Sequence, residues 1–123
     1  MDDRIHGALQ GKEVVVDITT TGRRTGRRRR MEIWFHNIEG RIIITGTPGP
    51  RGWLANLAAN PEFTLHLKGA VRADLPARAR LITDSAERRA IMAAPETGWY
   101  RGQVDSIDRL VEGSPMVEVV FTD

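Results

Sequence analysis

A β-hairpin encoded by EIWFHNIEGRIIIT, residues 32–45, is the feature that most restricts the fold of this chain. In its first strand, Ile33 and Phe35 lie on one face because side chains alternate along a strand. Trp34 and His36 lie on the other face. This alternation predicts a strand with one face against a hydrophobic core.

A tight turn at Glu39-Gly40 separates the first strand, Glu32–Ile38, from a second strand. Arg41–Thr45 (RIIIT) contains an unbroken apolar run, and a short continuous run of this kind is typical of a strand buried on both faces. Gly46–Gly49 (GTPG) ends the strand, since glycine and proline interrupt regular structure.

Four further segments have β-type sequences: Glu13–Thr19, Phe63–Lys68, Val71–Thr83 and Pro115–Phe121. In the second of them, Phe63, Leu65 and Leu67 share one face and His66 lies on the other. The third has apolar residues at the odd positions Val71, Ala73, Leu75, Ala79 and Leu81, which predicts a long half-exposed strand, bent at Pro76.

Short helices are predicted between the strands. The first has an apolar stripe of Trp53, Leu54 and Leu57 and ends at Asn60-Pro61, because proline cannot continue a helix.

A second helix is predicted to begin at the N-cap Asp84, with Glu87 as its capping-box partner, and to run to about Ala94. Gly98–Gly102 is predicted to be a loop or short turn, and Ser106–Val111 a brief helix. Six or so antiparallel strands with two or three short helices predict a mainly β fold, a small barrel with inserted helices rather than a βαβ sheet.

Length and composition are those of one globular domain over residues 1–123. The chain is 41% hydrophobic and 28% charged and contains no cysteine, so disulfides, thiol nucleophiles and cysteine-based metal sites are excluded. No apolar stretch approaches the roughly 20 residues of a membrane-spanning helix, and no signal peptide is recognisable. We therefore expect no integral membrane segment and a cytoplasmic location.

The stretch Arg23–Arg30 is the most unusual part of the sequence. Six of its eight residues are arginine, and the net charge of the chain is only +2. Without these six the net charge becomes +2 − 6 = −4, so the basic character is local. A general nucleic-acid-binding protein more often spreads Lys and Arg over a whole face.

The residues themselves leave three explanations for the arginines: a phosphate or polyanion site, a nucleic-acid site and a solvated turn. Gly22 and Gly26 bracket the turn and would let backbone N–H groups face an anion. Arginines crowded this closely repel one another unless an anion neutralises them, which favours anion binding. Trp34 and Phe35 resemble strand core more than a stacking platform for bases.

Familiar catalytic patterns are missing from the sequence. It contains no GxSxG, P-loop or GxGxxG motif, and its histidines, His6, His36 and His66, lack the spacing of metal ligands. We expect no metal site. If the chain is an enzyme, a cofactor supplies the difficult chemical step.

Several motifs in order carry a resemblance to a known family. TTTGRRTGRRRR, an EIWF strand, the GRIIITGTPG hairpin, the WLANLAANP helix and ARARLITDSAERR resemble the F420-dependent deazaflavin oxidoreductases, also called deazaflavin-dependent nitroreductases or F420H2-dependent quinone reductases. The resemblance covers roughly Val14–Arg89. This family belongs to the split β-barrel flavin-binding superfamily that includes pyridoxamine phosphate oxidase. The resemblance implies a six-stranded antiparallel split β-barrel forming a single cofactor-binding domain.

The cofactor implied by the resemblance is coenzyme F420, a deazaflavin with a phosphodiester and an acidic oligoglutamate tail. In the family the arginine turn binds the phosphate and tail, and a basic residue before the WLANLAANP helix adds a contact. The implied cofactor-binding residues are Arg23, Arg24, Thr25, Gly26, Arg29, Met31, Trp34, Thr47, Arg51 and Trp53.

The implied activity is hydride transfer from reduced F420 to a small quinone, enone or nitroaromatic. Tyr100, the only tyrosine, is the implied proton donor for the acceptor. In the turn before the EIWF strand, where the family often has proline or a small residue, this chain has Arg30, Met31 and Glu32. The carboxylate of Glu32 would lie near the ring or pair with an arginine. Relatives form dimers or monomers, so the resemblance leaves a homodimer open.

Two alternatives remain beside the F420 interpretation. The same barrel could bind FMN and act as an oxidase or reductase, although FMN lacks a polyanionic tail. The chain could instead be a non-enzymatic module for anions or nucleic acid, which predicts salt-dependent binding of DNA or RNA. The resemblance favours a small-molecule substrate and no nucleic acid.

Overall fold

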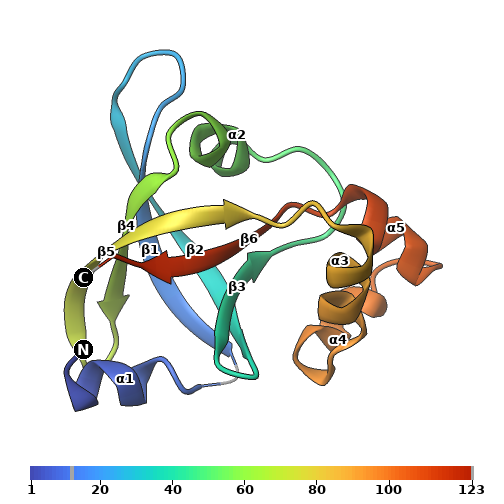
Figure 1. The fold of residues 1–123 in the computed structure, drawn as a ribbon, viewed down its shortest axis with the longest axis horizontal. Helices are drawn as coiled ribbons and strands as arrows, with labels where there is room; N and C mark the ends of the chain where they lie inside the picture. The colour runs from blue at the N-terminus through green and yellow to red at the C-terminus, as the bar shows by residue number, and fades with distance from the viewer. Residues whose placement is uncertain (12, 123) are drawn as a thin grey trace.

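The structure, a computed structural model, describes residues 1–11 and 13–122 as a closed antiparallel barrel with helices at its margins (Figure 1). Its strands follow one another around the barrel in the order β1-β2-β3-β6-β5-β4. They are β1 (Glu13–Thr21), β2 (Arg28–Ile38), β3 (Arg41–Thr45), β4 (Glu62–Lys68), β5 (Arg72–Leu81) and β6 (Met116–Phe121). The predicted six-stranded antiparallel barrel is confirmed.

The helices are α1 (Asp3–Ala8), α2 (Gly52–Ala59), α3 (Ser85–Ala93), α4 (Gly98–Arg101) and α5 (Ile107–Gly113), with a short 3₁₀ helix, η1 (Pro95–Thr97). In Figure 1, α2 lies beside the upper end of the barrel and α3, α4 and α5 gather at its right-hand side. None of the helices in the described part of the chain is long and apolar enough to span a membrane.

The β2–β3 hairpin forms as its sequence predicts. Glu39 and Gly40 have positive φ angles of 54° and 85°, the backbone of the tight turns that match the twist of paired strands. His36 pairs with Ile43 and Ile38 with Arg41 across the turn. A short local turn therefore sets the register of this pair.

Strand β3 is buried on both faces, which explains its continuous apolar run. Ile42 and Ile44 point into the barrel core, beside Phe35 and Leu65. Ile43 points the other way, into a second hydrophobic cluster. That helical cluster consists of Ile43, Ile82, Ile91, Met92, Tyr100, Leu110 and Met116.

Two sequence-based expectations need correction, and one helix was missed. Leu81 is 37% exposed rather than packed in the barrel, because β5 ends there and Ile82 turns into the helical cluster instead. Gly98–Arg101 forms the one-turn helix α4 rather than a loop. The N-terminal helix α1, capped by the side chain of Asp2, was not predicted.

The predicted start of α3 is confirmed, but its capping box is only half formed. The side chain of Asp84 accepts a hydrogen bond of 2.9 Å from the backbone N–H of Glu87. The carboxylate of Glu87 does not return to the N-cap, since it binds Arg41 and Arg80 from the barrel. The helix therefore uses this residue to attach itself to the strands.

Candidate functional site

The arginine-rich stretch divides into a loop and the start of a strand. Strand β2 begins at Arg28, four residues earlier than predicted, and continues the ladder with β1 through the pairs Thr21–Arg28 and Thr20–Arg29. Residues 22–27 form the loop. The resulting β1–β2 hairpin projects beyond the barrel at the top of Figure 1, so its arginines lie outside the hydrophobic core.

Two glycines close the loop at the hairpin tip. The N–H of Gly22 donates to the carbonyl of Arg27 at 2.7 Å, and the N–H of Gly26 donates to the carbonyl of Gly22 at 3.0 Å. Gly26 has a φ of 70°, which few residues other than glycine adopt without strain. These N–H groups are therefore bonded inside the turn, contrary to the expectation that they face an anion.

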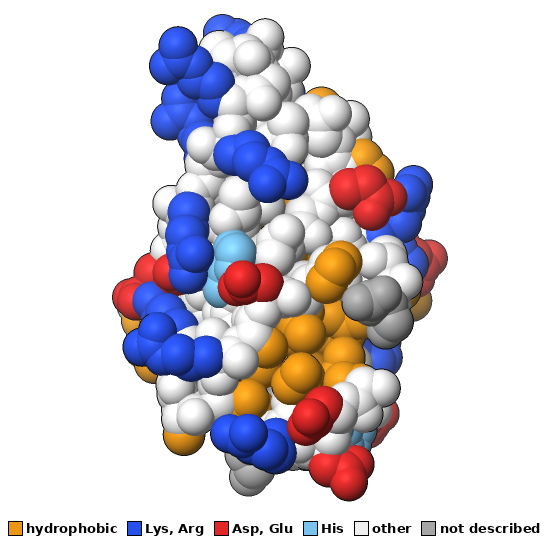
Figure 2. Space-filling view, turned by 90° about the vertical axis from the view of Figure 1, so that its left-hand side faces the viewer, with side chains coloured by type: hydrophobic (Ala, Val, Ile, Leu, Met, Phe, Trp, Pro, Cys, Tyr) orange, Lys and Arg blue, Asp and Glu red, His pale blue; other side chains and the backbone are white. Residues whose placement is uncertain are grey.

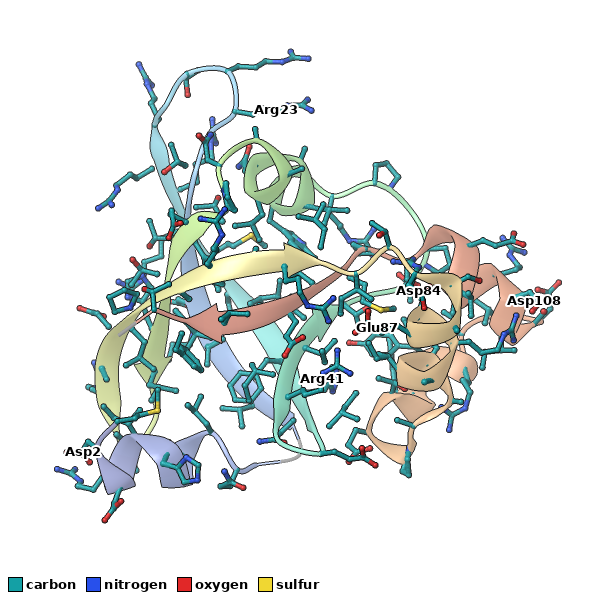
Figure 3. The ribbon with its side chains drawn as sticks, viewed as in Figure 1. Asp2, Arg23, Arg41, Asp84, Glu87 and Asp108 are labelled. Atoms are coloured by element: carbon teal, nitrogen blue, oxygen red, sulfur yellow. The ribbon has the colours of Figure 1, made fainter. Side chains whose placement is uncertain are left out.

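A cavity of about 600 Å³ lies between this hairpin and α2. Its lining residues are Thr20, Arg23, Arg29, Arg30, Met31, Arg51, Gly52, Trp53 and Asn56. Figure 3 shows Arg23 extending from the hairpin on the side where α2 lies. We call this the arginine cavity.

Asn56 connects α2 to the hairpin. Its side-chain oxygen accepts a hydrogen bond of 3.1 Å from the N–H of Arg23, and its amide nitrogen donates to Thr20 Oγ1 at 3.3 Å. The sequence-based expectations included neither Asn56 nor Thr20. Only the position of Asn56, three residues after Trp53 on the same helix, could have indicated that its side chain faces the same surroundings.

The positive charge of the arginine cavity is largely uncompensated. Arg30 is paired with Asp17 at 2.9 Å. Within residues 1–11 and 13–122, neither Arg23 nor Arg29 has an ion pair, and both are exposed. Crowded cations without counter-charges attract anions, so the cavity is suited to an anionic ligand.

Asp17, the partner of Arg30, is shared with a second cation. Lys68 Nζ lies 2.7 Å from Asp17 Oδ1, while Arg30 bonds to Oδ2. The hydrogen bonds from Lys68 and Arg30 hold the pKa of Asp17 below its usual value, so the group is ionised at neutral pH. Glu32 pairs with the same Lys68, rather than with an arginine.

Arg51 organises the loop that leads from β3 into α2. Its guanidinium donates to the carbonyls of Thr47 and Gly49, at 3.0 Å each, and to Thr47 Oγ1 at 3.1 Å. A Cβ at Gly46 or Gly49 would lie only 3.2 or 3.3 Å from this guanidinium. The two glycines therefore leave room for Arg51, which lines the cavity while holding the loop.

The first turn of α2 adds to the positive character of the arginine cavity. Gly52 and Trp53 line the cavity, and the helix has no side-chain cap at its N-terminus. The N-terminal end of a helix carries a partial positive charge and N–H groups that bind anions. Trp53 also reaches the barrel core.

Some predicted binding residues lie elsewhere. Trp34 and Met31 lie on opposite faces of β2. Trp34 is 47% exposed and does not line the arginine cavity. Thr47 lines a second cavity, of about 670 Å³, together with Pro48, Gly102, Gln103, Val104, Asp105 and Arg109. Arg24, Thr25 and Gly26 lie in the hairpin tip, where Thr25 Oγ1 accepts a hydrogen bond from the N–H of Arg27.

Tyr100 lies in the helical cluster. Its hydroxyl is 2.8 Å from His36 Nε2, and the two rings meet edge to face with centroids 5.3 Å apart. Tyr100 lines neither the arginine cavity nor the second cavity. The structure thus brings together Arg23, Arg29, Met31, Arg51 and Trp53 but not Tyr100.

The other histidines have partners within the fold. His66 bonds to Thr19 Oγ1 and to Asp74 Oδ1, at 2.7 Å each, on the outer face of the sheet. His6 lies 3.1 Å from the amide of Gln10. Among residues 1–11 and 13–122, no cluster of three or more His, Asp or Glu side chains is arranged to hold a metal ion.

The fold and the cavity define a class: a split-barrel protein with an arginine-lined cavity between a basic hairpin and a short helix. The family model described as F420H(2)-dependent quinone reductase matches residues 1–111. The chain therefore belongs to the F420H(2)-dependent quinone reductase family, and the expected enzyme class, an F420H2-dependent reductase with coenzyme F420, is confirmed.

Solved structures share the fold of this chain. An F420 reductase is 14% identical, with 96% of this chain and 93% of that chain covered and a TM-score of 0.68. A putative pyridoxamine 5′-phosphate oxidase from Listeria innocua is 15% identical; the match covers 98% of this chain and 93% of that chain, with a TM-score of 0.68. A structure described as a domain-swapped dimer is 21% identical; the match covers 85% of this chain and 78% of that chain, with a TM-score of 0.56.

Proposed function

We propose that this protein transfers hydride from reduced coenzyme F420 to a small organic acceptor of the quinone, enone or nitroaromatic type. The observation that carries the proposal is the arginine cavity, with its unpaired Arg23 and Arg29, in a member of this reductase family. Its volume of about 600 Å³ lies within the usual range for small-molecule sites.

The residues of the arginine cavity fit the anionic part of the cofactor. Arg23 and Arg29 present guanidinium groups suited to bidentate contact with a phosphate. The first turn of α2, at Gly52, adds the positive end of a helix dipole. Arg51 would act mainly by holding that turn in place, because its own nitrogens are bonded to loop carbonyls.

The apolar residues that line the arginine cavity fit the aromatic ring of the cofactor. Met31 and Trp53 provide hydrophobic surface next to the arginines, which would orient a flat ring and exclude water from it. When bound, reduced F420 supplies a hydride. The protein then needs to hold donor and acceptor in contact and to provide a proton.

The acceptor would lie against the exposed side of the bound ring, because hydride passes only between atoms in contact. Thr47 lines the second cavity and is bonded to Arg51, which lines the arginine cavity, so the two cavities are neighbours and the second could receive the part of the acceptor that extends beyond the ring. Tyr100 stays the predicted proton donor. Its bond to His36 means that its hydroxyl would have to leave that partner or donate through it.

The assembly and the location of the protein are also proposals. The match to a domain-swapped dimer supports a homodimer as one assembly to test, by sedimentation or light scattering. A cytoplasmic location, expected from the sequence, stays a prediction.

A binding titration tests the proposal. Purified cofactor-free protein is titrated with F420 and, separately, with FMN, following cofactor fluorescence. We expect tight binding of F420 and weak binding of FMN, and Arg29→Gln should weaken F420 binding at least about tenfold, because it removes a charge-assisted contact. Arg72→Gln, the same substitution at an exposed position of β5, is the matched control.

Turnover is then measured with reduced F420 and three acceptors: menadione, a cyclohexenone and a nitroaromatic. Reduction of at least one of them, lost in Arg29→Gln at subsaturating cofactor, supports the proposal. Tight binding of FMN alone would move the protein to the flavin-dependent branch of the fold. Failure to bind either compound would contradict a role as a reductase.

A further inference from the structure

The arginines of helices α3, α4 and α5 are not all used by the fold. The side chains of Arg88 and Arg101 donate to backbone carbonyls. Arg89 pairs with Asp108. In the described part of the chain, by contrast, the guanidinium of Arg109 makes no hydrogen bond. This arginine of α5 is therefore available to a ligand in a way that the other three are not.

Asp105 is the one carboxylate that pairs with Arg109 among the described residues, and the pair is loose. Arg109 Nη1 lies 3.6 Å from Asp105 Oδ1, which is too long for a hydrogen bond. Both side chains are exposed, and an exposed ion pair contributes little to stability. A second carboxylate could therefore bind the guanidinium without first breaking a strong contact.

Arg109 lines the second cavity, of about 670 Å³, among largely polar neighbours. The lining has polar side chains at four positions, Thr47, Gln103, Asp105 and Arg109, and apolar side chains at two, Pro48 and Val104. A hydrocarbon chain in this space would take the polar groups out of water without giving them partners, which costs free energy. The second cavity therefore suits a polar or charged substituent better than a long apolar chain.

The helix that carries this arginine is fixed relative to the arginine cavity. The N–H of Gly49 donates to the carbonyl of Gly113, the last residue of α5, at 3.1 Å. A Cβ at Gly113 would lie only 3.1 Å from Pro48, so helix and loop are in close contact. Arg51 lines the arginine cavity and bonds to Thr47 on the same loop. Because the two cavities share this loop, a ligand that spans them would meet groups already held in place, which lowers the cost of ordering them.

We infer that the second cavity is the subsite for the substituent of the acceptor, and that Arg109 selects acceptors bearing a carboxylate over neutral acceptors of the same size. The inference rests on the proposed function, since it requires reduced F420 in the arginine cavity. A guanidinium presents parallel N–H donors that match the two oxygens of a carboxylate. Asp105 lines the same cavity and repels a bound carboxylate, so it limits the affinity.

Attraction of anions by the protein as a whole has to be separated from binding at Arg109. Figure 2 shows Lys and Arg side chains on the side of the molecule that lies to the left in Figure 1, away from α5. Charges there act on any anion at long range and are screened by salt. Contact with Arg109 depends instead on one side chain, which a substitution removes.

The test uses 4-nitrobenzoate and 4-nitrobenzamide, which share the ring and the nitro group and differ in the charge of one substituent. Values of kcat/KM are measured with saturating reduced F420 at about 150 mM salt, where the Debye length is about 8 Å. The two compounds also differ in intrinsic reactivity. The quantity compared is therefore the ratio of kcat/KM, benzoate to benzamide, in each variant relative to the wild type.

Arg109→Gln should lower this ratio about tenfold, because it removes charge-assisted bonds to the carboxylate. Asp105→Asn should raise the ratio about twofold, because it removes a repulsive charge. The matched control is Arg72→Gln, which removes the same charge from an exposed arginine at the start of β5. The control should leave the ratio within about 1.5-fold of the wild type.

Binding of the two compounds is also measured without turnover. Oxidised F420 cannot donate a hydride, so the complex of the protein with oxidised F420 is titrated with each compound, following cofactor fluorescence. The ratio of the two dissociation constants should change in each variant in the same direction as the preference in kcat/KM. Agreement of the two assays assigns the selection to binding of the substituent.

The outcomes separate the inference from the proposed function. An unchanged ratio in Arg109→Gln overturns the inference but leaves the proposed function standing. An equal loss for both compounds in Arg109→Gln, or a lower ratio in Asp105→Asn, also contradicts selection by charge. If the wild type binds F420 but reduces neither compound, the titration of the oxidised complex decides, and failure of 4-nitrobenzoate to bind there overturns the inference. Failure to bind F420 overturns both.

Discussion

Glu87 of α3 accepts a hydrogen bond of 2.5 Å from Arg80 of β5, and the same carboxylate binds Arg41 of β3. Glu118 of β6 bonds to both arginines as well, at 2.7 Å from Arg80 and 3.2 Å from Arg41. The four side chains form one network across three strands and a helix. This network attaches the helical cluster to the barrel.

Removing the charge of Glu87 should destabilise the protein. Glu87→Gln removes the negative charge and one of the two acceptor oxygens that the arginines share, and hydrogen bonds to charged groups contribute about 1.5 to 3 kcal/mol each. We expect the free energy of unfolding to fall by about 1 to 2 kcal/mol in urea titrations at pH 7. Glu62→Gln, which removes the exposed pair with Arg78, should change it by less than about 0.5 kcal/mol.

The contribution of Glu87 to the free energy of unfolding should depend on pH. The bond from Arg80 lowers the pKa of Glu87 from its ordinary value of 4.5. A carboxyl group whose pKa is lower in the folded state stabilises that state above the unfolded pKa and loses this contribution as pH falls through the folded value. The difference in the free energy of unfolding between the wild type and Glu87→Gln should be largest at pH 7 and should decrease below about pH 4.5. A constant difference would contradict the ion-pair explanation.

Gly26→Ala should weaken the hairpin. Gly26 has a φ of 70°, and a Cβ on this residue would have no neighbouring atom within 4 Å, so the cost is backbone strain, about 1 kcal/mol. Gly26→Asn should cost less, since asparagine tolerates this conformation. Thermal unfolding checks both, with Gly7→Ala in α1 as control, where alanine should be neutral or stabilising. Equal melting temperatures for all three would contradict the assigned turn.

Arg51→Lys tests whether Arg51 acts through its shape or only through its charge. Lysine keeps the charge but has one nitrogen in place of the two guanidinium nitrogens that bond separately to Gly49 and Thr47. We expect F420 affinity to fall roughly tenfold, because the loop before α2 loses its organising contacts. Thr47→Val, which removes only the bond from Arg51 to the hydroxyl, should have a smaller effect. Unchanged affinity in Arg51→Lys would show that charge alone matters.

Tyr100→Phe separates two roles of the Tyr100 hydroxyl. If Tyr100 donates the proton, kcat should fall about 100-fold or more while F420 affinity is kept. If the hydroxyl only bonds to His36, kcat should be kept and the free energy of unfolding should fall by about 1 kcal/mol. Steady-state kinetics together with urea unfolding gives a clear answer, and unchanged kcat would remove Tyr100 from the mechanism.

Local patterns in the sequence were sufficient for most of the strands. Alternation placed Phe63, Leu65 and Leu67 on the core side of β4, and the unbroken run in β3 correctly indicated burial on both faces. These predictions succeeded because the period of a strand and the burial of its residues appear in the residues themselves. The Glu39-Gly40 turn succeeded for the same reason.

Features that depend on distant partners were not predictable. Arg28–Arg30 have no β pattern of their own and extend β2 only because β1 offers the pairing partners Thr21, Thr20 and Thr19. Asn56 reaches Arg23 across 33 residues of sequence, and Tyr100 reaches His36 across 64. Arg51 was expected to contact phosphate, and its bonds to loop carbonyls could be recognised only from the folded backbone.

The hairpin that carries the arginines extends beyond the barrel, and its loop packs no side chain into the hydrophobic core. The charge and sequence of residues 22–27 can therefore change without changing the packing of the core. Residues 22–27 could be exchanged for the corresponding loop of another split barrel without repacking the interior. Such a chimera would replace Arg23 of the arginine cavity and leave Arg29, Arg30 and Arg51 in place, so its affinity for anions would separate the contribution of the loop from that of the barrel.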